Sequence, residues 1–125
     1  MENDTDQCIA TLQNAVSECK SEWIALSGGL DSSILAHLRK DQKPQAITII
    51  TKDFLGTDLT FAQIVAKHTR LNLSLMQVTM EEVLDSINET IKILDNFNDI
   101  EIRNSIVPHL YLSSLKKKGV DSVIT

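Results

Sequence analysis

Two patterns of apolar residues alternate along this chain. Four short runs are rich in apolar and β-branched residues: Trp23–Leu26, Ala46–Thr51, Leu73–Val78 and Ser122–Thr125. Such runs are typical of strands buried in a sheet, and the first of them ends at a pair of glycines. They predict three strands and the start or body of a fourth.

Between these runs, apolar residues return every three or four positions, which predicts amphipathic helices. Thr79 and Glu82 form a capping-box pattern ahead of one helix, and Gly119 is a candidate C′ residue after the last. Residues 95–102 are less regular. The predicted helices cover residues 5–20, 32–40, 58–68, 80–94 and 103–118.

Strands that alternate with helices predict a parallel sheet covered on both faces. Right-handed crossovers then give an α/β fold, a Rossmann-like doubly wound parallel sheet in a three-layer α/β/α arrangement with about four to five strands. No repeat, low-complexity tract or linker interrupts the pattern, so we expect residues 1–125 to form a single domain. An exposed sheet edge would permit assembly into a homo-oligomer.

The composition favours a cytoplasmic domain that coats neither nucleic acid nor membranes. The 125 residues include 12 Lys and Arg against 17 Asp and Glu, a net charge of −5, whereas phosphate backbones and membrane surfaces attract basic faces. No apolar run approaches the roughly 18 residues of a membrane span, and the first residues lack a secretory signal pattern. Cys8 and Cys19 lie on one predicted helix without metal or redox spacing, so we expect reduced, half-buried thiols.

Candidate chemistry is concentrated in residues 27–33, Ser-Gly-Gly-Leu-Asp-Ser-Ser, between the first predicted strand and the next helix. Adjacent glycines let a backbone approach a ligand, and a helix N-terminus offers unpaired N–H groups and partial positive charge to phosphate. The serine hydroxyls add donors. Asp31 would repel phosphate, which makes it a candidate Mg²⁺ ligand that joins protein and phosphate oxygens.

Parts of this segment also occur for structural reasons alone. Ser-Gly-Gly by itself is often a plain loop, and Asp-Ser-Ser by itself is often a helix cap. Joined between a strand and a helix, the two pieces indicate a functional site more specifically than either piece does alone. The segment is not a Walker loop, since no Lys follows the glycines, and it is not the dinucleotide pattern Gly-x-Gly-x-x-Gly.

Residues 27–33 resemble the PP-loop of the ATP pyrophosphatase superfamily (adenine nucleotide alpha hydrolase-like proteins), whose signature is Ser-Gly-Gly-x-Asp-Ser with a further Ser or Thr. With Leu30 at the variable position, the signature is most similar to its form in the asparagine synthetase branch. Residues 57–68 and 102–120 are similar to two further regions of that branch. The resemblance therefore covers the chain from Trp23 to Thr125.

The resemblance implies an ATP-dependent carbon–nitrogen ligase of the asparagine synthase type. Such an enzyme adenylates a carboxylate, here one like that of aspartate, and releases pyrophosphate before ammonia attacks the adenylate. Asp31 would be the Mg²⁺ ligand and the catalytic residue. The β- and γ-phosphates of ATP would be held by Ser27, Gly28, Gly29, Ser32 and Ser33, and adenosine would contact Leu26 and Ile50.

Two features of this sequence differ from those of the glutamine-dependent enzymes of the family. Glu2 follows Met1 where those enzymes have a nucleophilic Cys and a glutaminase domain, so we do not expect this chain to make ammonia. In the family, the strand that matches Ser122–Thr125 leads into an acidic Gly-rich loop with another Mg²⁺ ligand, and the sequence ends at that point. We therefore expect a partial domain that does not complete the reaction alone.

Residues outside the segment 27–33 give weaker indications of function. His37, His68 and His109 fall on three different predicted helices without metal-ligand spacing. Arg103 and Asn104 would open the last helix, whose N-terminus could face the same crevice, and they are candidate contacts for substrate or phosphate.

Two alternative functions stay open. The chain could be another PP-loop enzyme that amidates or thiolates tRNA or a nucleotide, although its acidic charge and the lack of Cys near the loop disfavour thiolation. It could also be a non-catalytic nucleotide-binding remnant, or a fragment of a longer enzyme.

Overall fold

Three parallel strands form the centre of the structure, a computed structural model that describes residues 2–52 and 57–125. The strands are β1 (Trp23–Ala25), β2 (Gln45–Thr51) and β3 (Asn72–Val78), and they lie in the order β1-β2-β3. Both neighbouring pairs are parallel, as predicted for a Rossmann-like sheet.

The fourth predicted strand is present only as a single bridge beside β1. The Ala25 N–H donates to the Ile124 carbonyl at 2.8 Å, and the Ile124 N–H donates to the Trp23 carbonyl at 2.9 Å. β2 occupies the opposite edge of β1. The described residues therefore contain three strands rather than the predicted four to five, because one bridge does not make a ladder.

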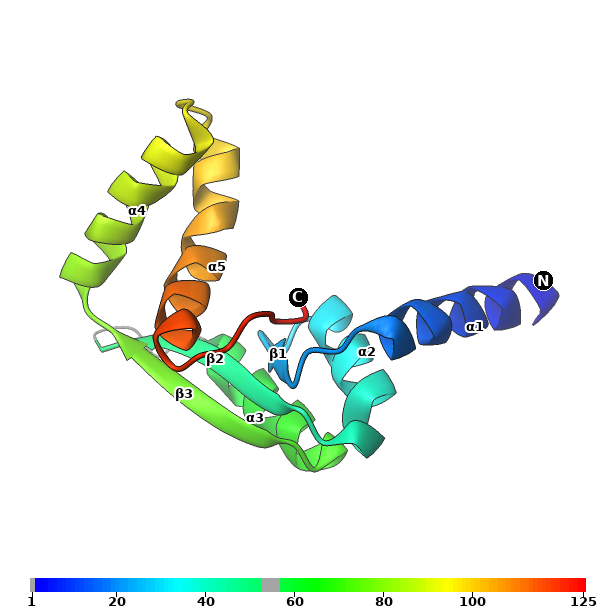
Figure 1. The fold of residues 1–125 in the computed structure, drawn as a ribbon. Coiled ribbons are helices and arrows are strands. Elements are labelled where there is room, and N and C mark those ends of the chain that lie inside the picture. Colours follow the sequence, from blue (N-terminus) through cyan, green and yellow to red (C-terminus); the bar gives the residue numbers. More distant parts are fainter. Residues whose placement is uncertain (1, 53–56) are drawn as a thin grey trace.

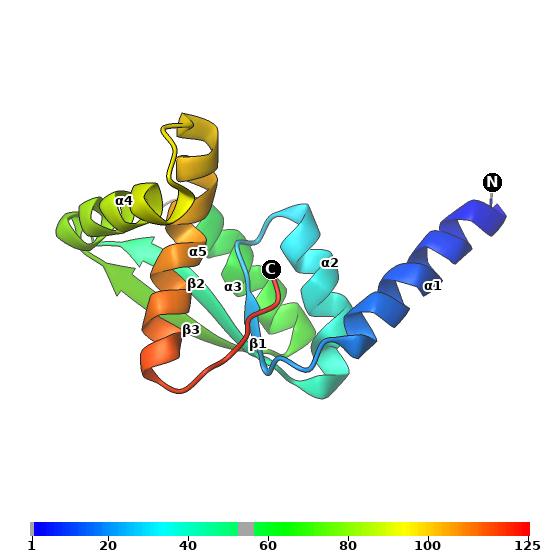
Figure 2. The ribbon, with the colours of Figure 1, turned by 45° about the horizontal axis from the view of Figure 1, so that its top comes forward.

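Helices cover both faces of the sheet (Figures 1 and 2). They are α1 (Glu2–Glu18), α2 (Leu30–Arg39), the short 3₁₀ turn η1 (Lys40–Gln42), α3 (Thr57–Thr69), α4 (Met80–Leu94) and α5 (Asp99–Lys117). α2 and α3 share a core with one face of the sheet, whereas α5 packs on the other face. α4 packs against α5. This arrangement confirms the doubly wound, three-layer prediction.

β2 is buried on both of its faces. Ala46 lies in the core shared with α2 and α3, whereas its neighbour Ile47 packs with Tyr111 and Leu115 of α5. Consecutive strand residues point to opposite faces, which is why this strand is apolar without regular alternation. On the first face the helices present small residues that let them come close to the sheet: Ala36, Ala62 and Ala66.

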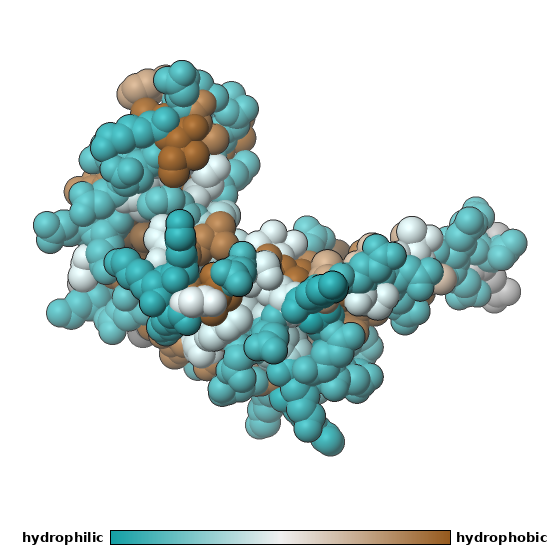
Figure 3. Space-filling view, in the orientation of Figure 1, coloured by the Kyte–Doolittle hydropathy of each residue, from teal (hydrophilic) through white to brown (hydrophobic). Residues whose placement is uncertain are grey.

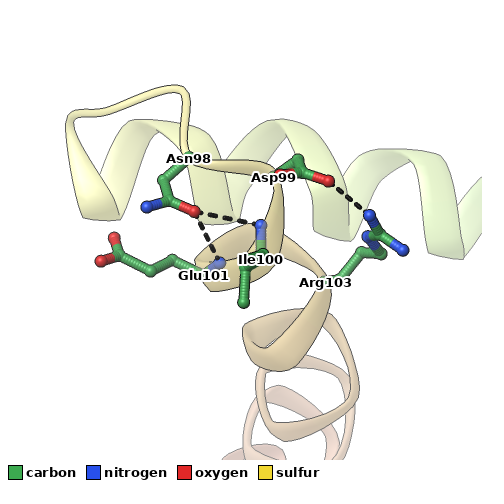
Figure 4. Close-up of polar contacts among 5 residues, drawn as sticks. All are labelled: Asn98, Asp99, Ile100, Glu101 and Arg103. Atoms are coloured by element: carbon green, nitrogen blue, oxygen red, sulfur yellow. Dashed lines mark hydrogen bonds and ion pairs between the residues drawn. The ribbon is translucent and has the colours of Figure 1, made fainter.

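Side chains set where α4 and α5 begin. The predicted capping box is confirmed, since the Glu82 N–H donates to Thr79 Oγ1 at 3.2 Å and the Thr79 N–H donates to Glu82 Oε2 at 2.7 Å. α5 begins earlier than predicted because Asn98 caps it. The Asn98 side-chain oxygen accepts from the N–H groups of Ile100 and Glu101 at 3.1 and 3.3 Å (Figure 4).

α5 ends in a Schellman motif at Gly119, as its predicted C′ role requires. Gly119 has φ +78°, its N–H donates to the Lys116 carbonyl at 3.0 Å, and the Val120 N–H donates to the Leu115 carbonyl at 3.1 Å. Pro108 lies inside this helix and not in its first turn. Because proline has no N–H, α5 lacks one internal hydrogen bond there.

α1 extends away from the sheet, and most of its predicted apolar face is exposed (Figure 1). Val16 is buried, but Ile9 and Leu12 are 48% and 37% exposed. Cys8 and Cys19 are exposed free thiols and not the half-buried ones predicted. The prediction failed because α1 contacts α2, whereas no other described element lies beside most of its length.

Large apolar side chains are also exposed on the hairpin of α4 and α5, where Figure 3 shows hydrophobic surface. They include Ile93, Phe97 and Ile100, which lie around the turn between the two helices. Across residues 2–52 and 57–125, no helix combines the length and the apolar character needed to cross a membrane.

Arg39 joins the end of α1 to α2. This residue is only 5% exposed, and its guanidinium donates to the carbonyls of Val16, Cys19 and Ser21 at 3.2, 2.5 and 2.6 Å. Carbonyls at a helix C-terminus lack intrahelical donors and carry partial negative charge, so they suit a buried cation. Arg39 therefore fixes the direction in which α1 leaves the domain.

Gly28 lets α3 reach the turn that follows β1. It has φ +83°, and a Cβ atom at this position would lie 2.5 Å from the Ala62 nitrogen and 2.6 Å from the Phe61 Cβ. Non-bonded contacts under 3.0 Å essentially never occur for a Cβ atom, and the Ala62 nitrogen belongs to the α3 backbone. Only glycine therefore fits here, for a packing reason in addition to any role toward a ligand.

Replacing Arg39 with Met should lower the free energy of unfolding by about 2 kcal/mol, because three carbonyls near the end of α1 lose a buried donor. Urea unfolding followed by the fluorescence of Trp23 measures the change. Lys67→Met, at an exposed position of α3, is the control and should unfold like the unmodified chain. Equal midpoints for the two variants would contradict the role of Arg39.

Replacing Gly28 with Ala should lower the free energy of unfolding by about 3 kcal/mol, since the methyl group collides with α3 and φ is left-handed. Gly119→Ala is a matched control: its φ is +78°, but nothing lies within 4 Å of an added Cβ. This control should lower the free energy of unfolding only by the backbone strain of the left-handed φ, about 1 kcal/mol. Equal losses in urea unfolding would show that contact with α3 is not what requires glycine at position 28.

Candidate functional site

The segment 27–33 lies where the direction of the sheet reverses. From β1 the chain proceeds to β2 and β3 on one side, whereas residue 124 returns to the other edge of β1. In open α/β sheets, ligands bind at the carboxyl ends of the strands beside such a reversal. The segment follows the carboxyl end of β1 and leads into α2, which makes it the candidate site.

Gly29 is the N-cap of α2 but leaves the first turn of the helix open. It has φ −70° and ψ 168°, and no side chain caps the helix at this position. The first N–H groups of a helix have no intrahelical acceptor, so those of Leu30, Asp31 and Ser32 can face an anion. The partial positive charge of the helix N-terminus favours the same ligand.

Three serine hydroxyls surround this helix N-terminus. Ser27 Oγ lies 3.0 Å from Ser32 Oγ and accepts from the Gly29 N–H at 3.2 Å. Ser32 and Ser33 both donate to the Gly29 carbonyl, at 3.2 and 2.7 Å. The structure thus brings the hydroxyls of the predicted loop together on a single turn.

α3 forms one wall of the loop, which the sequence motif does not reveal. Phe61 and Ala62 contact Gly28 from this helix, and Ala62 is fully buried. A small residue on the inward face of the helix after β2 is the signal that could have indicated the contact. Gly28 therefore faces α3, whereas Gly29 is exposed.

Asp31 is exposed in the first turn of α2. A carboxylate there complements the helix dipole, and it is also a hard oxygen ligand of the kind that Mg²⁺ prefers. In the part of the chain that the structure describes, no group of three or more His, Cys, Asp or Glu could hold a metal ion.

Leu26 and Ile50 lie on the sheet side of the site. Leu26 is 1% exposed, and its N–H donates to the Ile47 carbonyl at 2.8 Å. Ile50 is half-buried near the carboxyl end of β2, beyond the last residue paired with β1. Residues 53–56, which follow β2 closely, lie outside the described residues.

Arg103 and Asn104 are not brought to the loop. The prediction that they open the last helix is wrong, because the Asn98 cap starts α5 at Asp99. Arg103 forms an ion pair with Asp99 (Figure 4), and both lie near the start of α5, which stands away from α2 in Figures 1 and 2. A contact between these two residues and a substrate stays a prediction.

Shifted pKa values occur away from the loop. The Glu89–Lys92 hydrogen bond of 2.7 Å on α4 lowers the pKa of the Glu89 carboxyl and raises that of the Lys92 amine. Burial raises the pKa of Tyr111 on α5. These shifts report local pairing and burial in the α4–α5 hairpin and not acid–base chemistry at the loop.

Solved structures share this fold at low sequence identity. An NH3-dependent NAD synthetase from Campylobacter jejuni matches with a TM-score of 0.57 and 19% identity, over 98% of this chain and 54% of that one. An NMN synthetase from Francisella tularensis matches with a TM-score of 0.56 and 14% identity, over 98% and 52%. The chain spans about half the length of each, and the likeness shows the fold.

Sequence comparison identifies the family. No curated protein matches the chain. The family model of asparagine synthase, in contrast, matches residues 12–125, which include the whole loop and every strand of the sheet. The chain therefore belongs to the asparagine synthase family, which uses ATP.

Proposed function

We propose that the segment 27–33 binds the phosphates of Mg·ATP, and that the domain serves to adenylate a carboxylate with release of pyrophosphate. The observation that carries the proposal is the convergence of open N–H groups and three hydroxyls at the start of α2. A chain with a net charge of −5 repels polyphosphate as a whole, so the local donors have to supply the attraction.

The reaction class follows from the charge that such a loop can stabilise. In adenylation, a carboxylate oxygen bonds to the α-phosphorus while the bond from that phosphorus to the β-phosphate oxygen breaks. Pyrophosphate leaves with the electron pair, and donors fixed around it stabilise the developing charge by roughly 3–4 kcal/mol each. Mg²⁺ held by Asp31 and phosphate oxygens would neutralise further charge on the leaving group.

The proposed acceptor is an aspartate-like carboxylate, on the ground of the family. Attack of ammonia on the acyl carbon of the adenylate would form the amide and release AMP. A second candidate acceptor is the carboxylate of a nucleotide, because the two matched structures are described as synthetases of NAD and NMN. Both candidates use the same phosphate loop.

Calorimetry with Mg·ATP and with pyrophosphate tests the binding site. The chain should bind both, and Asp31→Asn should weaken Mg·ATP binding by about tenfold or more, because the cation loses a charged ligand. Glu81→Gln, in the exposed first turn of α4, is the matched control and should bind like the unmodified chain. The same Mg²⁺ dependence in Asp31→Asn and the unmodified chain would refute the metal role of Asp31.

The exchange of labelled pyrophosphate into ATP tests the chemistry. We expect little exchange from this chain alone with aspartate, since it spans about half the length of the matched synthetases. Robust exchange that requires aspartate would show that these residues adenylate it unaided. Exchange that instead requires a carboxylate precursor of NAD or NMN would favour the nucleotide as acceptor.

A further inference from the structure

β3 forms an edge of the sheet that has no neighbouring strand among the described residues. It stands last in the order β1-β2-β3, and its residues pair with β2 in one continuous register. Figure 1 shows β3 at the border of the sheet. The N–H and C=O groups that point away from β2 can therefore form hydrogen bonds with another strand.

Alternate residues of β3 carry these outward backbone groups. The Val78 carbonyl accepts from the Lys52 N–H at 3.3 Å, so the backbone groups of Val78 face the β2 side. Successive residues of a strand direct their backbone groups to opposite edges. Leu73, Leu75 and Gln77 therefore direct their N–H and C=O groups to the free edge.

The sequence of β3 lacks the features that usually keep edge strands from pairing. Asn72–Val78 contains no charged residue and no proline, and its unbroken pairing with β2 shows no bulge. The central residue, Leu75, is apolar and 47% exposed. Natural edge strands commonly carry a lysine, a proline or a bulge. β3 is thus suited to accept a further strand.

The charges at the two ends of β3 favour a second copy of the same strand. Arg70 is exposed shortly before the strand, and Glu81 is exposed shortly after it. In an antiparallel pair of identical strands, the basic end of each copy meets the acidic end of the other, whereas a parallel copy would place like charges together. The antiparallel pair is also closed by a twofold axis, so the assembly stops at two chains.

We infer that β3 is a homodimer interface, in which two copies of the strand pair in antiparallel orientation about a twofold axis at Leu75. With the two Leu75 residues opposite each other, Leu73 lies opposite Gln77 of the other copy, and every outward N–H and C=O group of the strand has a partner. The exposed Leu75 side chains cover each other at the centre. Because the contact is small, the dimer depends on concentration. The inference does not depend on the phosphate role of the segment 27–33.

Sedimentation velocity at rising protein concentration tests the interface. The unmodified chain should shift from monomer to dimer, and Leu75→Lys should raise the dissociation constant of the dimer by at least about fivefold, because two like charges then face each other. Ile64→Lys, at an apolar α3 position that is 57% exposed, is the matched control and should dimerise like the unmodified chain. A chain that stays monomeric up to about 1 mM, or a dimer that Leu75→Lys leaves unchanged, would overturn the inference.

Disulfide cross-linking tests the register and does not require Leu75→Lys to fold. In a background of Cys8→Ser and Cys19→Ser, which removes the exposed thiols, Leu75→Cys should oxidise to a covalent dimer, since the facing Cα atoms lie about 5.5 Å apart. Gln77→Cys is the matched control, because its two copies lie about 14 Å apart in this register and cannot be bridged. Equal rates of cross-linking at the two positions, or none at position 75, would overturn the proposed pairing.

Discussion

The candidate site depends on β1 being paired along both of its edges. β2 holds one edge, and the hydrogen bonds of Ile124 with Ala25 and Trp23 hold the other. With only three residues, β1 has few bonds of its own, and these neighbours fix the point at which the chain leaves the sheet. The turn that follows is then confined between that exit, α3 at Gly28 and the start of α2. The open N–H groups therefore have a defined direction before any ligand arrives.

Features that depend on neighbours in the sequence were predicted well. The order of strands and helices follows from apolar spacing, and the Thr79–Glu82 capping box and the Gly119 terminus follow from local backbone chemistry. The loop from Ser27 to Ser33 is equally local, since a strand, two glycines and a helix start occur in one run of residues. The sequence therefore located the candidate site and most of the N–H and hydroxyl donors that the structure gathers there.

Features that depend on distant contacts were missed. The spacing of Ile9 predicts a helix face, but not whether another element covers that face, and among the described elements none covers it over most of the length of α1. Arg39 gave no sequence signal, because its partners are backbone carbonyls of another segment. The contact of Phe61 with Gly28 joins two segments that lie far apart in the chain. Asn98 is a local cap, and its signal was available but hidden by the irregular spacing around it.

The attachment of α1 has a practical consequence for work with this protein. Its C-terminal end is anchored by Arg39, and its other end points away from the sheet and from the start of α2 (Figures 1 and 2). Most of the helix is exposed, so a label or surface linker at its first turns stays clear of the segment 27–33. The exposed thiol of Cys8 offers a chemical handle on the same helix, although Cys19 would have to be replaced first because it is exposed as well. The domain can thus be immobilised through α1 with its loop directed toward solution.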